Sequence, residues 1–333
     1  MDSRDLKHKY MMRSFVPSAS EFQDSLILKP ATECSSATPD VTVVTVCFNP
    51  LKAGRQELFS RNLDSVQRQA GVMVEHLIVD GASTDGTMDF LKAFDNKHHN
   101  LRILSKTDSG LYEAMNRGIA LAKGRYVAFL NSDDYYHDDD GLAASVKALD
   151  ESWCSFSFAP ILAKKPHGVS LRKPQLRLHK FFVFCVTRHP SMLFRLTDLM
   201  EIGGYDQAYR VAADYDLMLR LVAAGHKACF VNHCFVTFVE GGFAMQNEEL
   251  KLKEKVEIIR NVHREAFGVE FTDEEAESLV RNCTYPRKYL RVYEKSQRLV
   301  ANSFVCLPQN FLFRLVRNFN YTKYWLSCFL SFA

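Results

Sequence analysis

The chain has 333 residues, of which 47% are hydrophobic and 24% are charged, so its composition is that of a folded globular protein rather than a disordered one. Its net charge of +3 is too small to indicate a nucleic-acid partner. The nine cysteines include no Cys-x-x-Cys pair, so the sequence predicts neither a zinc site nor a disulfide framework and suits a reducing compartment.

The first 40 residues mix charged residues with Ser, Pro and Thr. We interpret residues 1–40 as a tail or a loosely docked arm. The charged N-terminus is not followed by the apolar core of a signal peptide, so we expect no signal peptide. No run of apolar residues in the sequence approaches the roughly 18 that a membrane-spanning helix needs. We therefore expect a cytoplasmic protein that is at most peripheral on the inner face of the cell membrane.

Between residues 41 and 130, apolar runs alternate with segments of helical periodicity. The runs are rich in branched and aromatic residues, which is typical of strands buried on both faces of a sheet. The predicted strands are residues 41–48, 74–79, 101–104 and 126–130. The first intervening helix is marked by Phe59, Leu63, Val66 and Ala70, which lie on one face. This alternation predicts an α/β fold with a mostly parallel, doubly wound central sheet and helices on both faces.

Three of these predicted strands end in polar residues: Asn49, Asp80, and the adjacent Asp133 and Asp134. Each cluster alone is typical of a solvated turn. However, the carboxyl ends of parallel strands share one edge of a sheet, where open α/β sheets bind ligands. One nucleotide cleft therefore explains all three clusters, and paired carboxylates suit a divalent cation that holds a diphosphate. Neither a Gly-x-Gly-x-x-Gly fingerprint nor a Walker A loop is present, which disfavours a Rossmann dehydrogenase and a P-loop kinase.

Six blocks of the sequence lie in or just after the predicted strands and helices: residues 43–49, 78–87, 108–118, 129–134, 189–195 and 213–217. Together they resemble the family 2 glycosyltransferases, which have the GT-A fold. They follow the order and spacing of that family over residues 41–245, which we take as one domain, and two of them are most similar to bacterial exopolysaccharide enzymes such as those of colanic acid biosynthesis. The resemblance implies transfer of a sugar from a nucleotide-diphosphate donor to a glycan or polyprenyl-diphosphate-linked acceptor in surface polysaccharide biosynthesis.

The resemblance also implies roles for individual residues near the donor. It assigns donor binding to Asn49, Pro50, Asp80, Asp108, Asn116 and Asp133. A Mg²⁺ or Mn²⁺ ion would be held by Asp133 or Asp134. Asn131 stands where many members of the family carry the first carboxylate, so the direct metal ligand is left open between the two aspartates.

Asp214 is the expected catalytic base, which would take the proton of the acceptor hydroxyl. It begins a stretch of helical periodicity, so an N-cap role is the structural alternative, and Asp216 could cap the helix in its place. The sequence offers no candidate for a covalent glycosyl intermediate, and direct displacement by the acceptor would invert the anomeric centre.

The resemblance places His189 on the acceptor or diphosphate side, where a structural hydrogen-bonding role is the alternative. Gly241 and Gly242 would let a loop hinge over the acceptor, and an ordinary turn is the alternative there.

The last part of the chain, residues 246–333, is predicted to be a helical extension. From Arg281 onward it has nine basic residues and one acidic residue, a net charge of +8, which leaves −5 for residues 1–280. Residues 308–333 add aromatic residues to these charges, which suits a helix lying on an anionic membrane. A helix docked on the catalytic domain has the same pattern.

Two other functions stay open on the sequence alone. A nucleotidyltransferase would also use a metal and a diphosphate, but the loop after the first strand is a poor version of the glycine-rich basic loop that it needs. The other alternative is a non-catalytic module that binds sugar nucleotides or glycans. It stays open because Asn131 stands where many members of the family carry a carboxylate.

Overall fold

The computed structural model describes residues 16–22, 26–28, 38–98, 101–174, 182–183 and 187–283, with a few positions between 285 and 295. The predicted membrane-binding segment, residues 308–333, and most of the predicted arm, residues 1–40, lie outside the described residues.

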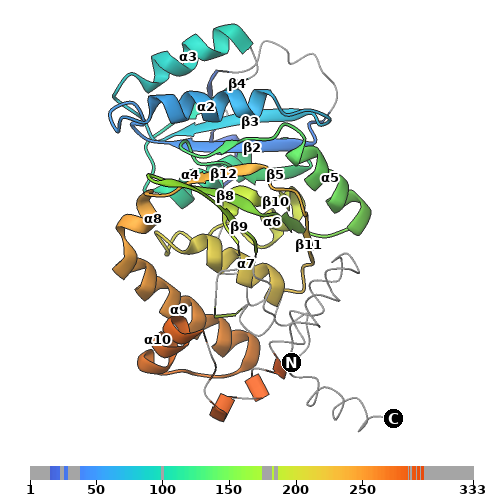
Figure 1. Ribbon diagram of the computed structural model, residues 1–333, viewed down its shortest axis with the longest axis vertical. Coiled ribbons are helices and arrows are strands. Elements are labelled where there is room, and N and C mark those ends of the chain that lie inside the picture. The colour runs from blue at the N-terminus through green and yellow to red at the C-terminus, as the bar shows by residue number, and fades with distance from the viewer. Residues whose placement is uncertain are drawn as a thin grey trace.

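The central element is an eight-stranded sheet in which β4, β3, β2 and β5 run parallel. Strand β10 is antiparallel to both of its neighbours, and β1 pairs antiparallel at the other edge. The prediction of a mostly parallel sheet is therefore confirmed (Figure 1). In spatial order the strands are β1 (Leu26–Leu28), β4 (Leu101–Ser105), β3 (Val74–Asp80), β2 (Val41–Cys47), β5 (Tyr126–Phe129), β10 (Met192–Arg195), β7 (Phe156–Phe158) and β11 (Ala228–Phe230).

Helices cover both faces of this sheet, as its buried strands require. On β2, Val44 and Val46 belong to one core cluster with α4 (Leu111–Leu121) and α7 (Ala213–Ala223). Cys47 belongs to another, with α2 (Gln56–Gln67) and α3 (Thr87–His98). Successive side chains of a strand point to opposite faces, so these clusters are the two sides of the sheet. Figure 1 shows α2 and α3 above the sheet and α7 below it.

A second, four-stranded sheet has the order β6-β12-β8-β9. Strand β12 runs parallel to β8 and antiparallel to β6, which follows the Asp133–Asp134 pair directly. Helix α5 (Gly141–Ser152) and the short helix α6 (Leu196–Glu201) pack beside the central sheet. The strands are β6 (Tyr135–Tyr136), β12 (Val236–Val239), β8 (Ile161–Lys165) and β9 (Gly168–Arg172).

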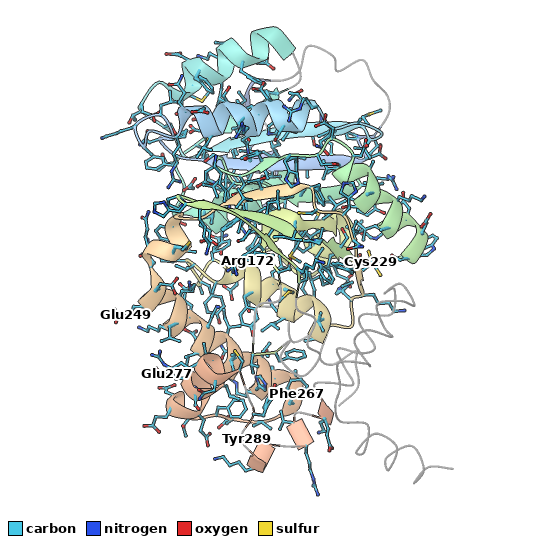
Figure 2. The ribbon with its side chains drawn as sticks, viewed as in Figure 1. Arg172, Cys229, Glu249, Phe267, Glu277 and Tyr289 are labelled. Atoms are coloured by element: carbon cyan, nitrogen blue, oxygen red, sulfur yellow. The ribbon has the colours of Figure 1, made fainter. Side chains whose placement is uncertain are left out.

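The predicted helical extension is present in the described part of the chain as α8 (Phe243–Gln246), α9 (Glu248–Phe267) and α10 (Asp273–Asn282). The boundary predicted at residue 245 falls inside α8, and the division into domains stays a prediction. Figure 2 shows Phe267 and Tyr289 in the lower part of the molecule and Glu249 at its outer edge. Among the described residues, no helix is long and apolar enough to cross a membrane.

Candidate active site

The three polar strand ends meet at one edge of the sheet, as the sequence predicted. Cys47 at the end of β2 pairs with Asp80 at the end of β3, and Val44 pairs with Phe129 at the end of β5. The loops that follow these strands therefore start side by side.

The loops after β2 and β3 are joined by hydrogen bonds from Asn49. Its backbone N–H donates to Ser83 Oγ at 2.7 Å, and its side-chain Oδ1 accepts from the backbone N–H of Thr84 at 2.8 Å. Asn49 has φ 48°, a left-handed conformation that Asn tolerates better than most residues. Pro50 is buried directly after it. Asn49 therefore ties the two loops together at this edge of the sheet.

Asp80 is fully buried beneath these loops. Its carboxylate accepts hydrogen bonds from the Ser83 backbone N–H at 3.0 Å and from Ser105 Oγ at 2.6 Å. These contacts brace the loop after β3. The carboxylate is thus enclosed by hydrogen-bonding groups of the protein itself. Its contact with the nucleotide sugar stays a prediction.

Phe48 and Asp108 both approach Gly81 closely. A Cβ atom added at Gly81 would lie 3.0 Å from Asp108 Oδ2 and 3.2 Å from Phe48 Cδ2, so the absence of a side chain lets these groups converge. Phe48 is 66% exposed, although it follows a buried strand. Burial raises the pKa of the half-buried Asp108, and Arg117 opposes that effect. The arrangement offers an aromatic face beside a carboxylate, which suits a nucleobase.

Asp133 faces Arg55 and Gly242. Arg55 Nη1 lies 2.9 Å from Asp133 Oδ2, and a Cβ atom at Gly242 would lie 3.9 Å from the same oxygen. The predicted hinge glycine and the predicted metal carboxylate are thus neighbours. Burial raises the pKa of Asp133, with Arg55 and His189 opposing the rise.

Asp134, by contrast, is enclosed. Its Oδ1 accepts from the Val239 backbone N–H at 2.8 Å, and its Oδ2 accepts from Asn131 Nδ2 at 3.1 Å. Burial and then the charge of Asp133 raise its pKa well above the ordinary value. Asp134 therefore joins the turn after β5 to β12 in the second sheet.

The carboxylates present fit a metal ion that is coordinated partly by the protein and partly by the phosphates of the nucleotide sugar. Mg²⁺ in such sites is commonly bound by one or two carboxylates and completed by substrate phosphates. Asp133 supplies one carboxylate of this kind, whereas both oxygens of Asp134 are used inside the protein. Among the described residues, no group of three or more His, Cys, Asp and Glu could hold a metal without the donor.

Asp214 is connected to this turn through His189. His189 Nδ1 lies 3.6 Å from Asp214 Oδ2, and His189 Nε2 lies 3.3 Å from Asn131 Oδ1. Burial alone would raise the pKa of Asp214, but His189 and Arg188 outweigh it, so the pKa is lowered. The Asp214 side chain is 22% exposed. It is thus an ionised carboxylate at neutral pH that keeps some contact with solvent.

The N-cap alternative for Asp214 does not hold. The N-cap of α7 is Ala212, which has no capping side chain, and Asp214 lies in the first turn. Asp216 does not cap the helix either, because it pairs with Arg220 at 2.6 Å.

Asn116 lies away from this cluster. Its Nδ2 donates to the Tyr205 carbonyl and its Oδ1 accepts from the Tyr205 N–H, both at 2.8 Å. The side chain is fully buried and holds the turn after α6. The geometry gives its predicted donor role no support.

Sequence reasoning missed Phe48 and Arg55. The sequence placed Phe48 in the buried strand 41–48, whereas β2 ends at Cys47 and Phe48 is 66% exposed. Arg55 gave no signal, because its partner is 78 positions away in the sequence.

A pocket of about 500 Å³ lies between α2 and β6 and includes none of the predicted site residues. Its lining carries two basic and two acidic side chains. The residues are Glu57, Ser60, Arg61, Asp64, Arg68, Tyr135, Tyr136 and His137.

This sheet, with its donor loops at the carboxyl ends of β2, β3 and β5, has the GT-A architecture of glycosyltransferases, and solved structures share it. The chain is similar to S. aureus TarS residues 1–349 in complex with UDP-GlcNAc, with a TM-score of 0.57, 17% identity and 79% of each chain covered. It is also similar to the mannosyltransferase PcManGT from Pyrobaculum calidifontis in complex with GDP-Man and Mn²⁺, with a TM-score of 0.52, 17% identity, and 90% of this chain and 82% of that chain covered. The expected fold class is confirmed.

The chain belongs to glycosyl transferase family 2, whose family model matches residues 42–212. It is 32% identical over 180 residues to a PGL/p-HBAD biosynthesis glycosyltransferase of Mycobacterium bovis, which is 53% of this chain and 65% of that protein. It is 32% identical over 136 residues to the putative teichuronic acid biosynthesis glycosyltransferase TuaG of Bacillus subtilis, which is 40% of this chain and 52% of that protein. The chain thus matches less than two thirds of the length of these relatives. Their names do not single out colanic acid.

Proposed function

We propose that the protein is a nucleotide-sugar-dependent glycosyltransferase that acts in surface glycan or glycolipid biosynthesis. The observation that carries the proposal is the Asn131–His189–Asp214 connection, which links the turn bearing Asp133 to the predicted base. Family membership and relatives named for PGL/p-HBAD and teichuronic acid biosynthesis support the reaction class. The narrower exopolysaccharide assignment of the colanic acid type stays a prediction.

In this proposal the nucleobase stacks on Phe48 beside Asp108, and the diphosphate lies towards Asp133. Asp133 would hold the Mg²⁺ or Mn²⁺ ion, which when bound supplies positive charge at the leaving diphosphate. Gly242 lies next to Asp133 and leaves room for the sugar end of the donor.

The base step follows from the surroundings of Asp214. Its lowered pKa keeps it ionised, so it can take the acceptor hydroxyl proton, and His189 orients it. The acceptor oxygen then forms the new glycosidic bond at the anomeric carbon as the bond to the diphosphate breaks. A single displacement inverts that carbon. The acceptor is a glycan or a polyprenyl-diphosphate-linked glycan.

The test is release of nucleoside diphosphate from UDP-, GDP- and dTDP-sugars with Mg²⁺ or Mn²⁺, in wild type and Asp214→Asn. The substitution keeps an oxygen that can accept from the Tyr215 N–H, so we expect the fold and donor binding to persist. Loss of the base should lower the rate by about 10²–10⁴-fold. A matched control is Asp273→Asn, an acid in the first turn of α10, which should leave the rate unchanged.

The same assay separates the alternatives. A nucleotidyltransferase would exchange pyrophosphate instead of releasing a nucleoside diphosphate. A binding module would bind the donor without turnover in both variants. Either result would contradict the proposed function.

A further inference from the structure

Arg55 forms an ion pair with the carboxylate that our proposed function gives to the metal. Its Nη1 lies 2.9 Å from Asp133 Oδ2. The Asp133 side chain is 12% exposed and that of Arg55 is 37% exposed. One face of the carboxylate is therefore covered by a guanidinium that itself reaches solvent.

The position of Arg55 is unfavourable for the helix that it precedes. Arg55 is the N-cap residue of α2, and its side chain makes no capping hydrogen bond. Helix N-termini carry partial positive charge, so an N-cap favours Ser, Thr, Asp or Asn, and a cation there is disfavoured. Helix stability therefore does not explain an arginine at this N-cap position. Residues that are unfavourable for their local secondary structure concentrate at functional sites.

The backbone that carries Arg55 is held firmly. Its N–H donates to the Pro50 carbonyl at 3.0 Å, and the Ala53 N–H donates to the Asn49 carbonyl at 3.2 Å. The Lys52 N–H donates to Asp85 Oδ2 at 2.8 Å, which joins this turn to the loop after β3. Movement of the guanidinium therefore needs only side-chain rotation.

Asp133 has little freedom to move away from it. Asp134, the next residue, is fixed by the hydrogen bond from the Val239 N–H in β12. A divalent cation at Oδ2 would meet the guanidinium charge, and like charges at such a distance repel. The metal ion and the Arg55 guanidinium therefore compete for this oxygen.

We propose that Arg55 is an exchangeable counter-ion of the donor site. It neutralises Asp133 while the site is empty, and it moves to an oxygen of the donor diphosphate when the metal and the nucleotide bind together. Arg55 is thus a positioning residue for the donor, and this inference rests on the proposed function.

The exchange makes a prediction about coupling. Metal alone must displace Arg55 without giving it a new partner, so it binds weakly. A nucleotide diphosphate offers that partner, so nucleotide should strengthen metal binding, and the reverse holds by the same factor. Removing the guanidinium should strengthen metal binding in the absence of nucleotide and weaken nucleotide binding in the presence of metal.

The experiment measures Mn²⁺ binding by paramagnetic resonance, with and without UDP, GDP or dTDP, in wild type, Arg55→Gln and Arg55→Lys. For Arg55→Gln we expect Mn²⁺ alone to bind about 3- to 10-fold tighter, since a partly exposed ion pair no longer competes. We expect the nucleotide to bind about 10-fold weaker in the presence of Mn²⁺, because a charge-assisted hydrogen bond is lost. Arg55→Lys keeps the charge and should fall between the two.

Arg61→Gln, an exposed arginine six residues further along in α2, is the matched control and should leave both affinities unchanged. Thermal unfolding of each variant reports whether the fold persists. If Arg55→Gln leaves Mn²⁺ binding unchanged or weakens it, or leaves nucleotide binding unchanged, the exchange is wrong while the proposed function stands. If wild type binds none of the nucleotides, the proposed function is wrong and the inference falls with it.

Discussion

At the scale of single residues, His189 is the group whose role can be separated most cleanly from a structural one. Burial pushes the pKa of Asp214 up, and His189 is the first of the groups that bring it down. A base works only when deprotonated, so a lowered pKa keeps the enzyme active to lower pH. In His189→Gln the burial remains while the interaction of the imidazole with the carboxylate is lost, so the pKa of Asp214 rises.

We therefore expect the acid limb of the kcat/KM profile to move to higher pH in His189→Gln. The measurement is nucleotide release across an acidic pH series. His233 pairs with Asp138 at 2.9 Å outside the site, so His233→Gln is the matched control and should leave the limb in place. A lower rate with an unmoved acid limb would indicate that His189 is only structural.

Phe48 gives a second residue-scale prediction. Its ring is 66% exposed at the carboxyl edge of the sheet, and stacking on a base is worth about 1–3 kcal/mol, so Phe48→Ala should weaken nucleotide binding about tenfold. Calorimetric titration with the nucleoside diphosphate measures this. Met73, also exposed, immediately precedes β3 at the opposite edge, and Met73→Ala should leave the affinity as it is. Equal losses in both variants would remove Phe48 from the donor site.

At the scale of elements, helix α4 packs directly against strand β2 of the central sheet. A Cβ atom added at Gly118 in α4 would lie 2.4 Å from Val44 Cγ1, so the helix packs against the strand where only glycine fits. Gly118→Ala should cost about 1–3 kcal/mol through overpacking. Urea unfolding with an unchanged m-value would show the loss.

The double variant tests the cause. Val44→Ala removes the methyl groups that the new Cβ would meet, so Gly118→Ala should cost less in a Val44→Ala background than in wild type. Such coupling is expected for residues in contact. If Gly118→Ala lowers the free energy of unfolding by the same amount in both backgrounds, the contact with Val44 is not the cause of the loss.

The elements also show why the sequence predicted some parts and not others. Strand β2 is buried on both faces and is rich in Val, and β3 contains the apolar run 77–79 before Asp80, so the positions of these strands and their shared edge could be predicted. Strand β6 has two residues, and β9 is largely exposed, so these two strands of the second sheet left no periodic signal. The sequence could also not show that the Asn116 amide is used up by the backbone of Tyr205, 89 positions away.

At the scale of the whole molecule, the net charge is distributed unevenly along the chain. Residues from Arg281 onward carry a net charge of +8, while residues 1–280 carry −5. Within residues 308–333, Arg314, Arg317 and Lys323 alternate with Phe, Tyr, Trp and Leu. Basic residues near an anionic lipid surface contribute about 1 kcal/mol each, and aromatic side chains suit the interface. We propose that this segment holds the protein on the membrane that presents a polyprenyl-linked acceptor.

Vesicle flotation tests this attachment with the full chain and with a chain that ends at residue 307. The full chain should float with vesicles that contain phosphatidylglycerol, much less with pure phosphatidylcholine, and less as salt rises, because screening weakens the attraction of the basic residues. The shorter chain should stay in the vesicle-free fractions. Arg314→Gln with Arg317→Gln removes two charges and keeps the aromatic residues, so it should weaken binding to anionic vesicles while leaving nucleotide release from soluble donors intact. If the full chain stays free of anionic vesicles, or if the shorter chain binds them equally well, the segment is not the attachment site.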